Sequence, residues 1–408
     1  MYEKLSKLFY KLSQSEYNTE YEKRFSSYGS YKTNLKIKGF RKGQFTKDEF
    51  ELFYVNIPSL MNLNNEVLMN SSKIKSLVHL LPEFVIKPYF NKLIINEAQS
   101  NNEIEGVKST KKELGEALKE LEKSEPKNKK FIGLMKTYLH IEDINPFEKL
   151  EDFRNIYDEL VSEEISLDNK PDGDLFRKSY VEINDGNNTT HIGVIGEENI
   201  SLELNNLITY LDTSEQPNLY KYMVAHYFYE YIHPFYDGNG RTGRLLVGSY
   251  LARYLEKYSA ITFSYAVNKN KSVYYKALED IPFPTNKGEM TFYLMDMLKL
   301  LSNGQKGIIE DLEINLMKLE KIKKYLININ NLSEESKKIL YILVTISVFV
   351  SENIHLKSQD LITLSKLSRY KLEKVMSELE SVEFVELQSK NPKSYKVCDS
   401  CLEEIIPI

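Results

Sequence analysis

The residues from His233 to Arg244 are of the types that bind phosphate and move a proton. The segment reads H-P-F-Y-D-G-N-G-R-T-G-R. Gly238 and Gly240 lack side-chain bulk, so the backbone around them can approach an anion closely. A helix that begins here offers free N–H groups and a favourable dipole. Arg241, three residues before Arg244, shares a helix face with it, and both can bind phosphate oxygens.

His233 and Asp237 add an acid–base group and a metal ligand. A carboxylate such as Asp237 can hold Mg²⁺ beside phosphates, and a histidine beside a phosphate can take the proton of an attacking hydroxyl. A glycine turn near arginines is common as a purely structural feature, but a structural turn does not need all of these groups in one segment. His226, on the same helix face as His233, is interpreted as a packed helix histidine.

The segment resembles the signature of the Fic family, H-x-F-x-[D/E]-G-N-G-R-x-x-R, and matches it at every fixed position. The resemblance covers residues from about 50 to 300. It implies a helical core and the transfer of AMP from ATP to a Ser, Thr or Tyr hydroxyl of a protein. Relatives that phosphorylate or transfer phosphocholine tend to depart from the glycines or arginines, so the intact motif favours AMP transfer.

The resemblance also implies a role for each motif residue. His233 would be the general base, Phe235 would anchor the loop in the core, and Asp237 would bind Mg²⁺ between the α- and β-phosphates. The remaining residues would surround the phosphates of ATP. The anion site would be formed by Gly238, Asn239 and Gly240, with the Asn239 side chain near the phosphates. Arg241 would hold the β-phosphate, and Arg244 the γ-phosphate.

A β-hairpin is predicted within Phe176–Ile200, because two β-prone runs flank the turn N-D-G-N-N, residues 184–188. It lies where the family has a flap that holds the target backbone by strand addition, and the implied docking residues are Thr190, His191, Ile192 and Gly193. Tyr275 and Asn286 lie in stretches that resemble those closing over the adenosine. Alternatively, Tyr275 is an aromatic residue of the core and Asn286 caps a helix.

The segment Ala98–Gly106, A-Q-S-N-N-E-I-E-G, resembles the inhibitory helix of many family members, whose pattern is [S/T]-x-x-x-E-[G/N]. Glu105 and Gly106 match this pattern, and the resemblance implies that Glu105 pairs with Arg244. Asn101 stands at the Ser/Thr position, a departure that still offers a hydrogen bond. The alternative for Glu105 is a solvated helix carboxylate, of which Glu103 is an example.

The surrounding sequence predicts a mainly α-helical protein, since apolar residues recur at three- and four-residue spacing. Helices at 218–232 and after Arg244 would flank the motif, and breaks are expected at Pro82 and Pro88. We expect an N-terminal helical region at 1–110 with the inhibitory helix near 95–107, a Fic core at 111–305, and a helical linker at 306–333. In 334–408, a helix, a helix-turn-helix and a hairpin have the order of a winged helix.

Composition narrows the functional classes. The 408 residues are 42% hydrophobic with a net charge of −5, so no general affinity for nucleic acid is expected. The chain shows neither a secretory signal nor a membrane-spanning run, and a cytoplasmic protein is expected. Cys398 and Cys401 form a C-x-x-C pair without the further ligands that zinc needs, so they are interpreted as two reduced thiols.

The predicted function is that of a protein adenylyltransferase with ATP as substrate and Mg²⁺ as cofactor, autoinhibited by Glu105. Its partners would be an unidentified target protein, or the chain itself, and not a membrane. The sequence leaves open a homodimer, a Fic enzyme that removes AMP with Glu105 positioning water, and a nucleotide-sensing regulator that binds DNA. The regulator has weak support, because residues 355–398 carry eight Lys/Arg against six Asp/Glu.

Overall fold

The computed structural model describes residues 2–121, 130–161, 164–184, 186, 188–351 and 354–406. The protein is mainly helical with small antiparallel sheets, which confirms the predicted fold class. It divides into two compact units. The first consists of Met1–Ser72 and Ile94–Lys306, and the second of Lys73–Leu93 and Gly307–Ile408.

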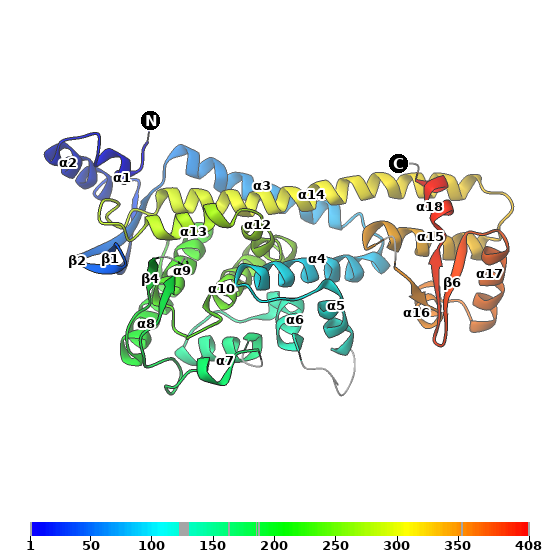
Figure 1. Ribbon diagram of the computed structural model, residues 1–408. Coiled ribbons are helices and arrows are strands. Elements are labelled where there is room, and N and C mark those ends of the chain that lie inside the picture. Colours follow the sequence, from blue (N-terminus) through cyan, green and yellow to red (C-terminus); the bar gives the residue numbers. More distant parts are fainter. Residues whose placement is uncertain are drawn as a thin grey trace. The chain divides into compact units, whose positions relative to one another are not determined.

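The helices, most of them labelled in Figure 1, are α1 (Leu5–Leu8), α2 (Gln14–Phe25), α3 (Pro58–Val78), α4 (Glu83–Ile104), α5 (Lys111–Glu120), α6 (Ile132–Leu139), α7 (Leu150–Val161), α8 (Glu197–Thr213), α9 (Asn218–Ile232), α10 (Asn239–Tyr254), α11 (Lys257–Ala260), α12 (Phe263–Lys269), α13 (Lys271–Asp280), α14 (Thr291–Asn328), α15 (Glu334–Phe349), α16 (Ser358–Ser365), α17 (Arg369–Ser381) and α18 (Asp399–Ile405). Two 3-10 turns are η1 (Ile141–Asp143) and η2 (Leu167–Asn169). The strands are β1 (Ser30–Arg41), β2 (Gln44–Val55), β3 (Glu182–Asn184), β4 (Thr189–Ile192), β5 (Leu356–Lys357), β6 (Val385–Lys390) and β7 (Lys393–Val397).

Helices α9 and α10 form the centre of the first unit. Both are buried along nearly their whole length, on every face, as expected of a helix that is enclosed by others. They pack against each other, and α7, α8, α11 and α12 surround them. The motif segment is the connection between these two central helices, so its backbone is anchored on both sides.

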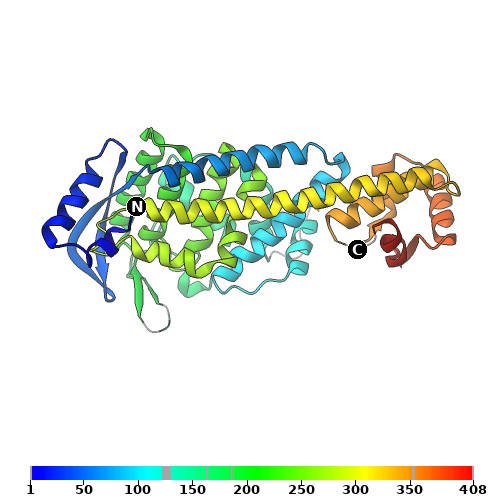
Figure 2. The same ribbon diagram turned by 90° about the horizontal axis from the view of Figure 1, so that it is seen from above.

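The predicted hairpin is present as the antiparallel pair β3–β4, in which Ile183 faces His191, and it is called the flap below. Figure 2 shows these strands, in green, standing out from the helices of the first unit. Asp185 and Asn187 of the predicted turn lie outside the described residues.

A second, longer hairpin precedes the flap, within the N-terminal region for which the sequence predicted only helices. Strands β1 and β2 pair over Ser30–Arg41 and Gln44–Val55. Buried Leu35 and Ile37 alternate with exposed lysines, the period of a half-buried strand. The two-residue connection Lys42-Gly43 has positive φ at both positions, 51° and 76°, as a type I′ turn requires.

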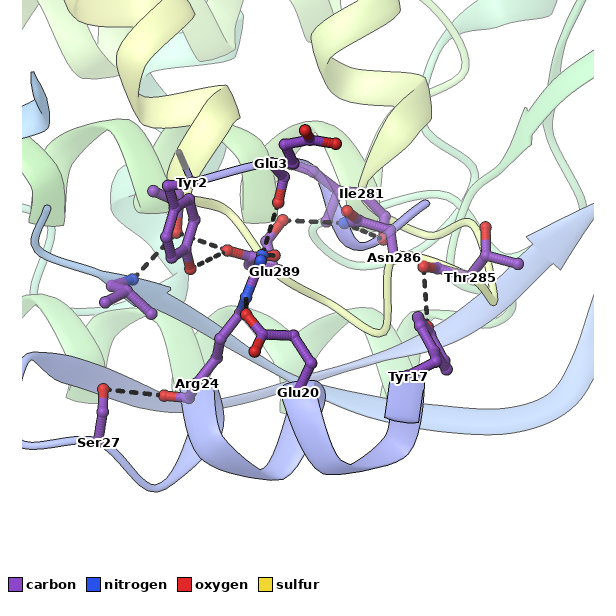
Figure 3. A network of polar contacts seen from close by, with 12 residues as sticks. Tyr2, Glu3, Tyr17, Glu20, Arg24, Ser27, Ile281, Thr285, Asn286 and Glu289 are labelled. Carbon is purple, nitrogen blue, oxygen red and sulfur yellow. Dashed lines mark hydrogen bonds and ion pairs between the residues drawn. The ribbon is translucent and has the colours of Figure 1, made fainter. Parts of the chain in front are cut away.

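A buried polar network fastens the N-terminal helices to the loop before α14 (Figure 3). Arg24 of α2 is 5% exposed and donates to Glu289 at 3.1 Å and to Glu20 at 2.8 Å. The Tyr2 hydroxyl donates to Glu289 as well, and the Tyr17 hydroxyl donates to the backbone oxygen of Thr285 at 2.9 Å. Because Arg24 compensates its buried carboxylate partner, the network holds this loop at a defined position.

The second unit contains the helices and strands expected at its C-terminal end. The buried faces of α15 and α17 pack together, and β5, β7 and β6 form an antiparallel sheet in that order. Cys398 and Cys401 are free thiols. No group of three or more metal-ligating side chains occurs in the described ranges, and no helix there is long and apolar enough to cross a membrane.

Candidate active site

The motif loop is held by the side chain of Asn239 and by the ring of Phe235. The Asn239 amide accepts a hydrogen bond from Phe235 N at 2.9 Å and donates one to Phe235 O at 2.7 Å. Phe235 is fully buried and stacks on Tyr157 with a centroid distance of 3.7 Å. Phe235 thus lies where an anchor is expected, whereas the Asn239 side chain closes the loop instead of remaining open to phosphates.

Two residues in left-handed backbone conformations bound this loop. His233 ends α9 with φ 54°, and Gly238 caps the start of α10 with φ 84°. A side chain at Gly238 would crowd Val161, with 2.9 Å between the added Cβ and a methyl carbon. The loop therefore turns sharply, and the N–H groups at the start of α10 are left for an anion.

Arg244 is paired with Glu105 at the end of α4. The Nη2 to Oε1 distance is 2.6 Å, and Arg244 is 1% exposed at its side chain while Glu105 is 25% exposed. Asn101, at the departing position of the inhibitory pattern, accepts from Arg244 Nε at 2.6 Å and donates to the Tyr138 hydroxyl at 2.8 Å. Asparagine therefore supplies the hydrogen bond to the arginine at this position.

The local structure of α4 directs Glu105 to the loop and Glu103 away from it. Gly106 ends the helix with φ 72°, a conformation that favours glycine. Glu103 instead accepts from Asn268 at 2.7 Å, and its backbone oxygen accepts from Lys271. A side chain at Gly240 would collide with the Glu105 carboxylate, so this carboxylate lies directly against the glycine loop.

Arg241 has a different partner, Glu164, which the sequence analysis did not identify. Their ion pair is 2.7 Å long, and Arg241 is 1% exposed at its side chain. Burial raises the pKa of Glu164, and the adjacent Arg241 opposes that shift. The two motif arginines are thus both neutralised by carboxylates from other elements, and neither pairing is visible from spacing within the motif.

His233 lies close to His191 of the flap and to Arg177. Its ring centroid lies 6.2 Å from that of His191 in the flap, and its Nδ1 has no hydrogen-bond partner. Burial, followed by His191 and Arg177, lowers the pKa of His233 to about 3. The imidazole is therefore neutral at physiological pH, the form that can accept a proton.

Arg177 is a second residue that the sequence analysis missed. Its fully buried guanidinium donates to the backbone oxygens of His233 at 2.9 Å, Ser179 at 2.6 Å and Val194 at 2.7 Å. Ser179 and Val194 flank the two flap strands, so one side chain ties both ends of the flap to His233. Burial lowers the pKa of Arg177 to about 10. The sequence offers no signal for it beyond a lone arginine before the hairpin.

Asp237 has the properties expected of a metal ligand. It is half-buried beside Gly238 and makes no hydrogen bond or ion pair with any residue that the structure describes. One carboxylate with substrate phosphates and waters is a usual environment for Mg²⁺. The residues present therefore fit a magnesium ion that is completed by the phosphates of a nucleotide.

Two further carboxylates, Glu230 and Glu97, interact electrostatically with Arg244. Glu230 of α9 is almost enclosed, its Oε1 has no hydrogen-bond partner, and burial raises its pKa to about 8. Glu97 of α4 accepts from the backbone N–H groups of Ser264 and Tyr265, each at 2.8 Å, and burial raises its pKa to about 7. His226 is fully buried and bonds to Gly243 O and the Tyr274 hydroxyl, as a packed histidine does.

A pocket of about 150 Å³ brings most of these groups together, and its lining includes Glu105, Thr190, His191, His233, Gly240, Arg244 and Tyr275. Ile192 and Gly193 of the flap are not in this lining. Asn286 is not either. Its amide donates to Ile281 O at 3.3 Å and Glu289 O at 2.8 Å, so it braces a turn (Figure 3). Tyr275 donates to Ile104 O at 3.2 Å and thereby contacts the end of α4.

The model of the Fic/DOC family matches residues 146–251, which include the motif, the flap, all of α9 and most of α10. The chain therefore contains a Fic/DOC family domain. Proteins with this domain are generally transferases, and they typically use nucleotide substrates with a metal ion.

Three solved structures are similar to this chain to different degrees. A Fic family protein from Desulfovibrio desulfuricans G20 superposes with a TM-score of 0.52 at 18% identity, over 85% of this chain and 98% of that one. A Fic domain containing signaling protein from Bacteroides thetaiotaomicron gives 0.41 at 18% identity, over 72% and 99% of the two chains. Residues 134–508 of Fic-1 from C. elegans give 0.44 at 15% identity, over 63% and 73%. The first of these shows a shared fold.

Proposed function

We propose that this protein is an Mg²⁺-dependent adenylyltransferase that moves AMP from ATP to a Ser, Thr or Tyr hydroxyl of a target protein or of itself. The observation that carries the proposal is the carboxylate of Glu105 against the glycine loop, paired with Arg244 at 2.6 Å. An anion already occupies the position where the start of α10 and the motif arginine favour one. The phosphates of ATP are the natural competitors for it.

In the proposed reaction the acceptor oxygen attacks the α-phosphorus, and the bond to the β-phosphate oxygen breaks. Pyrophosphate leaves, and His233 takes the proton of the hydroxyl. Asp237 would hold Mg²⁺, which neutralises phosphate charge when bound. Arg241 and Arg244 would bind the β- and γ-phosphates after exchanging their carboxylate partners for phosphate oxygens. Positioning and charge stabilisation supply most of the rate enhancement in such chemistry.

Autoinhibition follows from the same contacts. With Glu105 in place, Nη2 of Arg244 is held by the carboxylate, and the pocket volume of about 150 Å³ is below the roughly 300–1,000 Å³ of typical small-molecule sites. ATP could bind productively only after Glu105 releases Arg244. The nucleotide itself would favour this release, because phosphates and the carboxylate compete for one cation.

The reaction is tested by incubating the protein with ATP that is labelled at the α- or the γ-phosphate, with Mg²⁺ and a mixture of acceptor proteins. We expect incorporation of the α label only, an AMP adduct on a hydroxyl residue by mass spectrometry, and no incorporation by His233→Ala. Incorporation of the γ label would indicate phosphorylation instead. Release of AMP from a modified acceptor, without net addition, would indicate the reverse reaction.

The C-terminal region supports a second candidate, a regulator that binds DNA. Residues 334–408 have the element order of a winged helix, and Arg369 and Tyr370 are exposed at the start of α17. However, Arg369 lies 3.5 Å from Glu373, and Lys371 lies 3.3 Å from Glu335, so acidic neighbours reduce its affinity for phosphate. Salt-sensitive DNA binding that is lost in Arg369→Glu/Lys371→Glu would support this candidate. If no DNA binding is found, we expect residues 334–408 to contact other proteins instead.

A further inference from the structure

A groove of about 520 Å³ adjoins the active-site pocket on the flap side. The turn between β1 and β2 forms one wall, and the start of β4 forms another. Thr190 and Glu279 line both the groove and the pocket, so the two hollows are direct neighbours. Any chain that reaches His233 along β4 and continues past Thr190 enters this groove.

The rim of the groove is basic. Arg41 and Lys42 at the hairpin turn are exposed, and neither pairs with a carboxylate anywhere in the described ranges. The carboxylates of β2 contact other residues, since Asp48 accepts from the Thr46 hydroxyl at 3.3 Å, Glu49 pairs with Lys36 at 3.5 Å and Glu51 accepts from Asn34 N at 3.0 Å. The two cations are therefore available to an external anion.

The turn lies against the start of β4, so the backbone that carries these two cations is next to the flap. A Cβ built at Gly43 lies 3.6 Å from Thr189 Cβ, the distance of ordinary contact. Phe40 and Phe283 supply apolar surface in the lining, and Phe283 is 39% exposed. Glu279 is the one carboxylate among the lining residues that the structure describes, so the two basic side chains outnumber it.

We propose that this groove binds the segment of the acceptor polypeptide that flanks the modified hydroxyl, and that Arg41 and Lys42 select an acidic side chain in that segment. The inference rests on the proposed function, because it names the class of acceptor for the same site. A strand edge beside the pocket suits an extended peptide backbone, and unpaired cations next to it give specificity for charge. A polypeptide is favoured over a nucleic acid, because the groove has apolar floor residues, a carboxylate and only two cations.

The test compares three synthetic peptides that share a central tyrosine flanked on both sides by aspartate, alanine or lysine. Binding to the full-length Glu105→Gly protein is measured by fluorescence anisotropy without nucleotide. We expect the aspartate peptide to bind at least tenfold more tightly than the lysine peptide, with an advantage that falls as salt rises. The same order is expected for the rate of AMP transfer.

Charge reversal provides the matched variant. Arg41→Glu/Lys42→Glu should invert the preference, so that the lysine peptide binds more tightly than the aspartate peptide. Lys47→Glu, on the same hairpin but outside the groove lining, should leave the preference unchanged. An unchanged thermal unfolding midpoint in both variants shows that neither set of substitutions disturbs the fold.

The outcomes separate the two proposals. Equal binding of the three peptides, or a preference that survives charge reversal at the turn, overturns the groove assignment even if AMP transfer is observed. A single-stranded oligonucleotide that binds more tightly than the aspartate peptide and is lost on charge reversal also overturns it, in favour of nucleic acid. An inverting peptide preference in a protein that transfers no AMP supports the groove and refutes the reaction.

Discussion

Asp237 makes no hydrogen bond or ion pair with any residue that the structure describes, in contrast to the two arginines of the motif. Both motif arginines are paired, with Glu164 and Glu105. We predict that Asp237→Ala abolishes the Mg²⁺-dependent part of ATP affinity, since one carboxylate with phosphates holds this ion. Titration calorimetry with ATP, with and without Mg²⁺, measures that part. Asp172, an exposed carboxylate that accepts from Tyr236 at 2.9 Å, is the control position. An Asp237→Ala protein that still gains affinity from Mg²⁺ would rule out the metal role.

Glu230 gives a prediction for the pH dependence of stability. Burial raises its pKa from 4.5 to about 8, and Arg244 opposes the shift while Glu105 adds to it. The folded state therefore keeps a proton that the unfolded state releases near pH 4.5, so this stabilisation is complete at low pH and is lost as the pH rises through about 8. The pKa values of His191, His226 and His233 are lowered from 6.5, so these histidines change the stability only below about pH 6.5.

We predict that between pH 6.5 and 9 the unfolding free energy of Glu230→Gln declines less than that of the wild type. The difference in slope is at most about 1.4 kcal/mol per pH unit, the value for one proton. Glu97, with a pKa raised to about 7, contributes to the same decline in both proteins. Denaturant titrations across this pH range provide the measurement, and Glu103→Gln is the control. Parallel slopes for Glu230→Gln and wild type would show that Glu230 is not protonated in the fold.

At the scale of elements, Arg177 joins the flap to the end of α9 through three short hydrogen bonds to backbone oxygens. We predict that Arg177→Lys loosens the flap, because the single nitrogen of lysine cannot reach three carbonyls that Arg177 contacts from three different nitrogens. Amide hydrogen exchange in residues 179–194 should accelerate at least tenfold, while exchange in α15 and α17 stays unchanged. The KM for the acceptor should rise more than the KM for ATP. Uniform acceleration over the whole chain would mean a general loss of stability instead.

Helices were the elements that the sequence predicted best, since the apolar spacing of 218–232 and 334–350 is found in α9 and α15 with nearly the same limits. Pro82 lies between α3 and α4 as expected, but Pro88 lies inside α4 and does not break it. The β1–β2 hairpin was missed because its exposed lysines reduce the apolar content of the strands. Its Lys-Gly turn is also a weaker signal than Asn-Gly.

At the scale of the whole molecule, the motif could be identified from one short segment of the sequence, but most of the residues that contact it could not. Glu164 is 77 positions from Arg241, and Glu105 is 139 positions from Arg244. The resemblance to an inhibitory pattern made Glu105 predictable. Glu164, Arg177 and Glu230 are single residues without a pattern, and only the packing of α7, the flap and α9 around α10 brings them to the site. Folding thus supplies the electrostatic environment that the motif itself does not encode.

The central claim is that Glu105 competes with nucleotide for Arg244, and it is tested most directly by the rate of AMP transfer, including self-modification, in Glu105→Gly. Removal of the carboxylate frees a buried arginine, and about 1.4 kcal/mol of lost competition corresponds to tenfold in rate. We predict an increase of at least tenfold with α-labelled ATP and Mg²⁺. Glu103→Gly, whose carboxylate faces Asn268 instead, should match the wild type. Equal rates for Glu105→Gly, Glu103→Gly and the wild type would contradict the account.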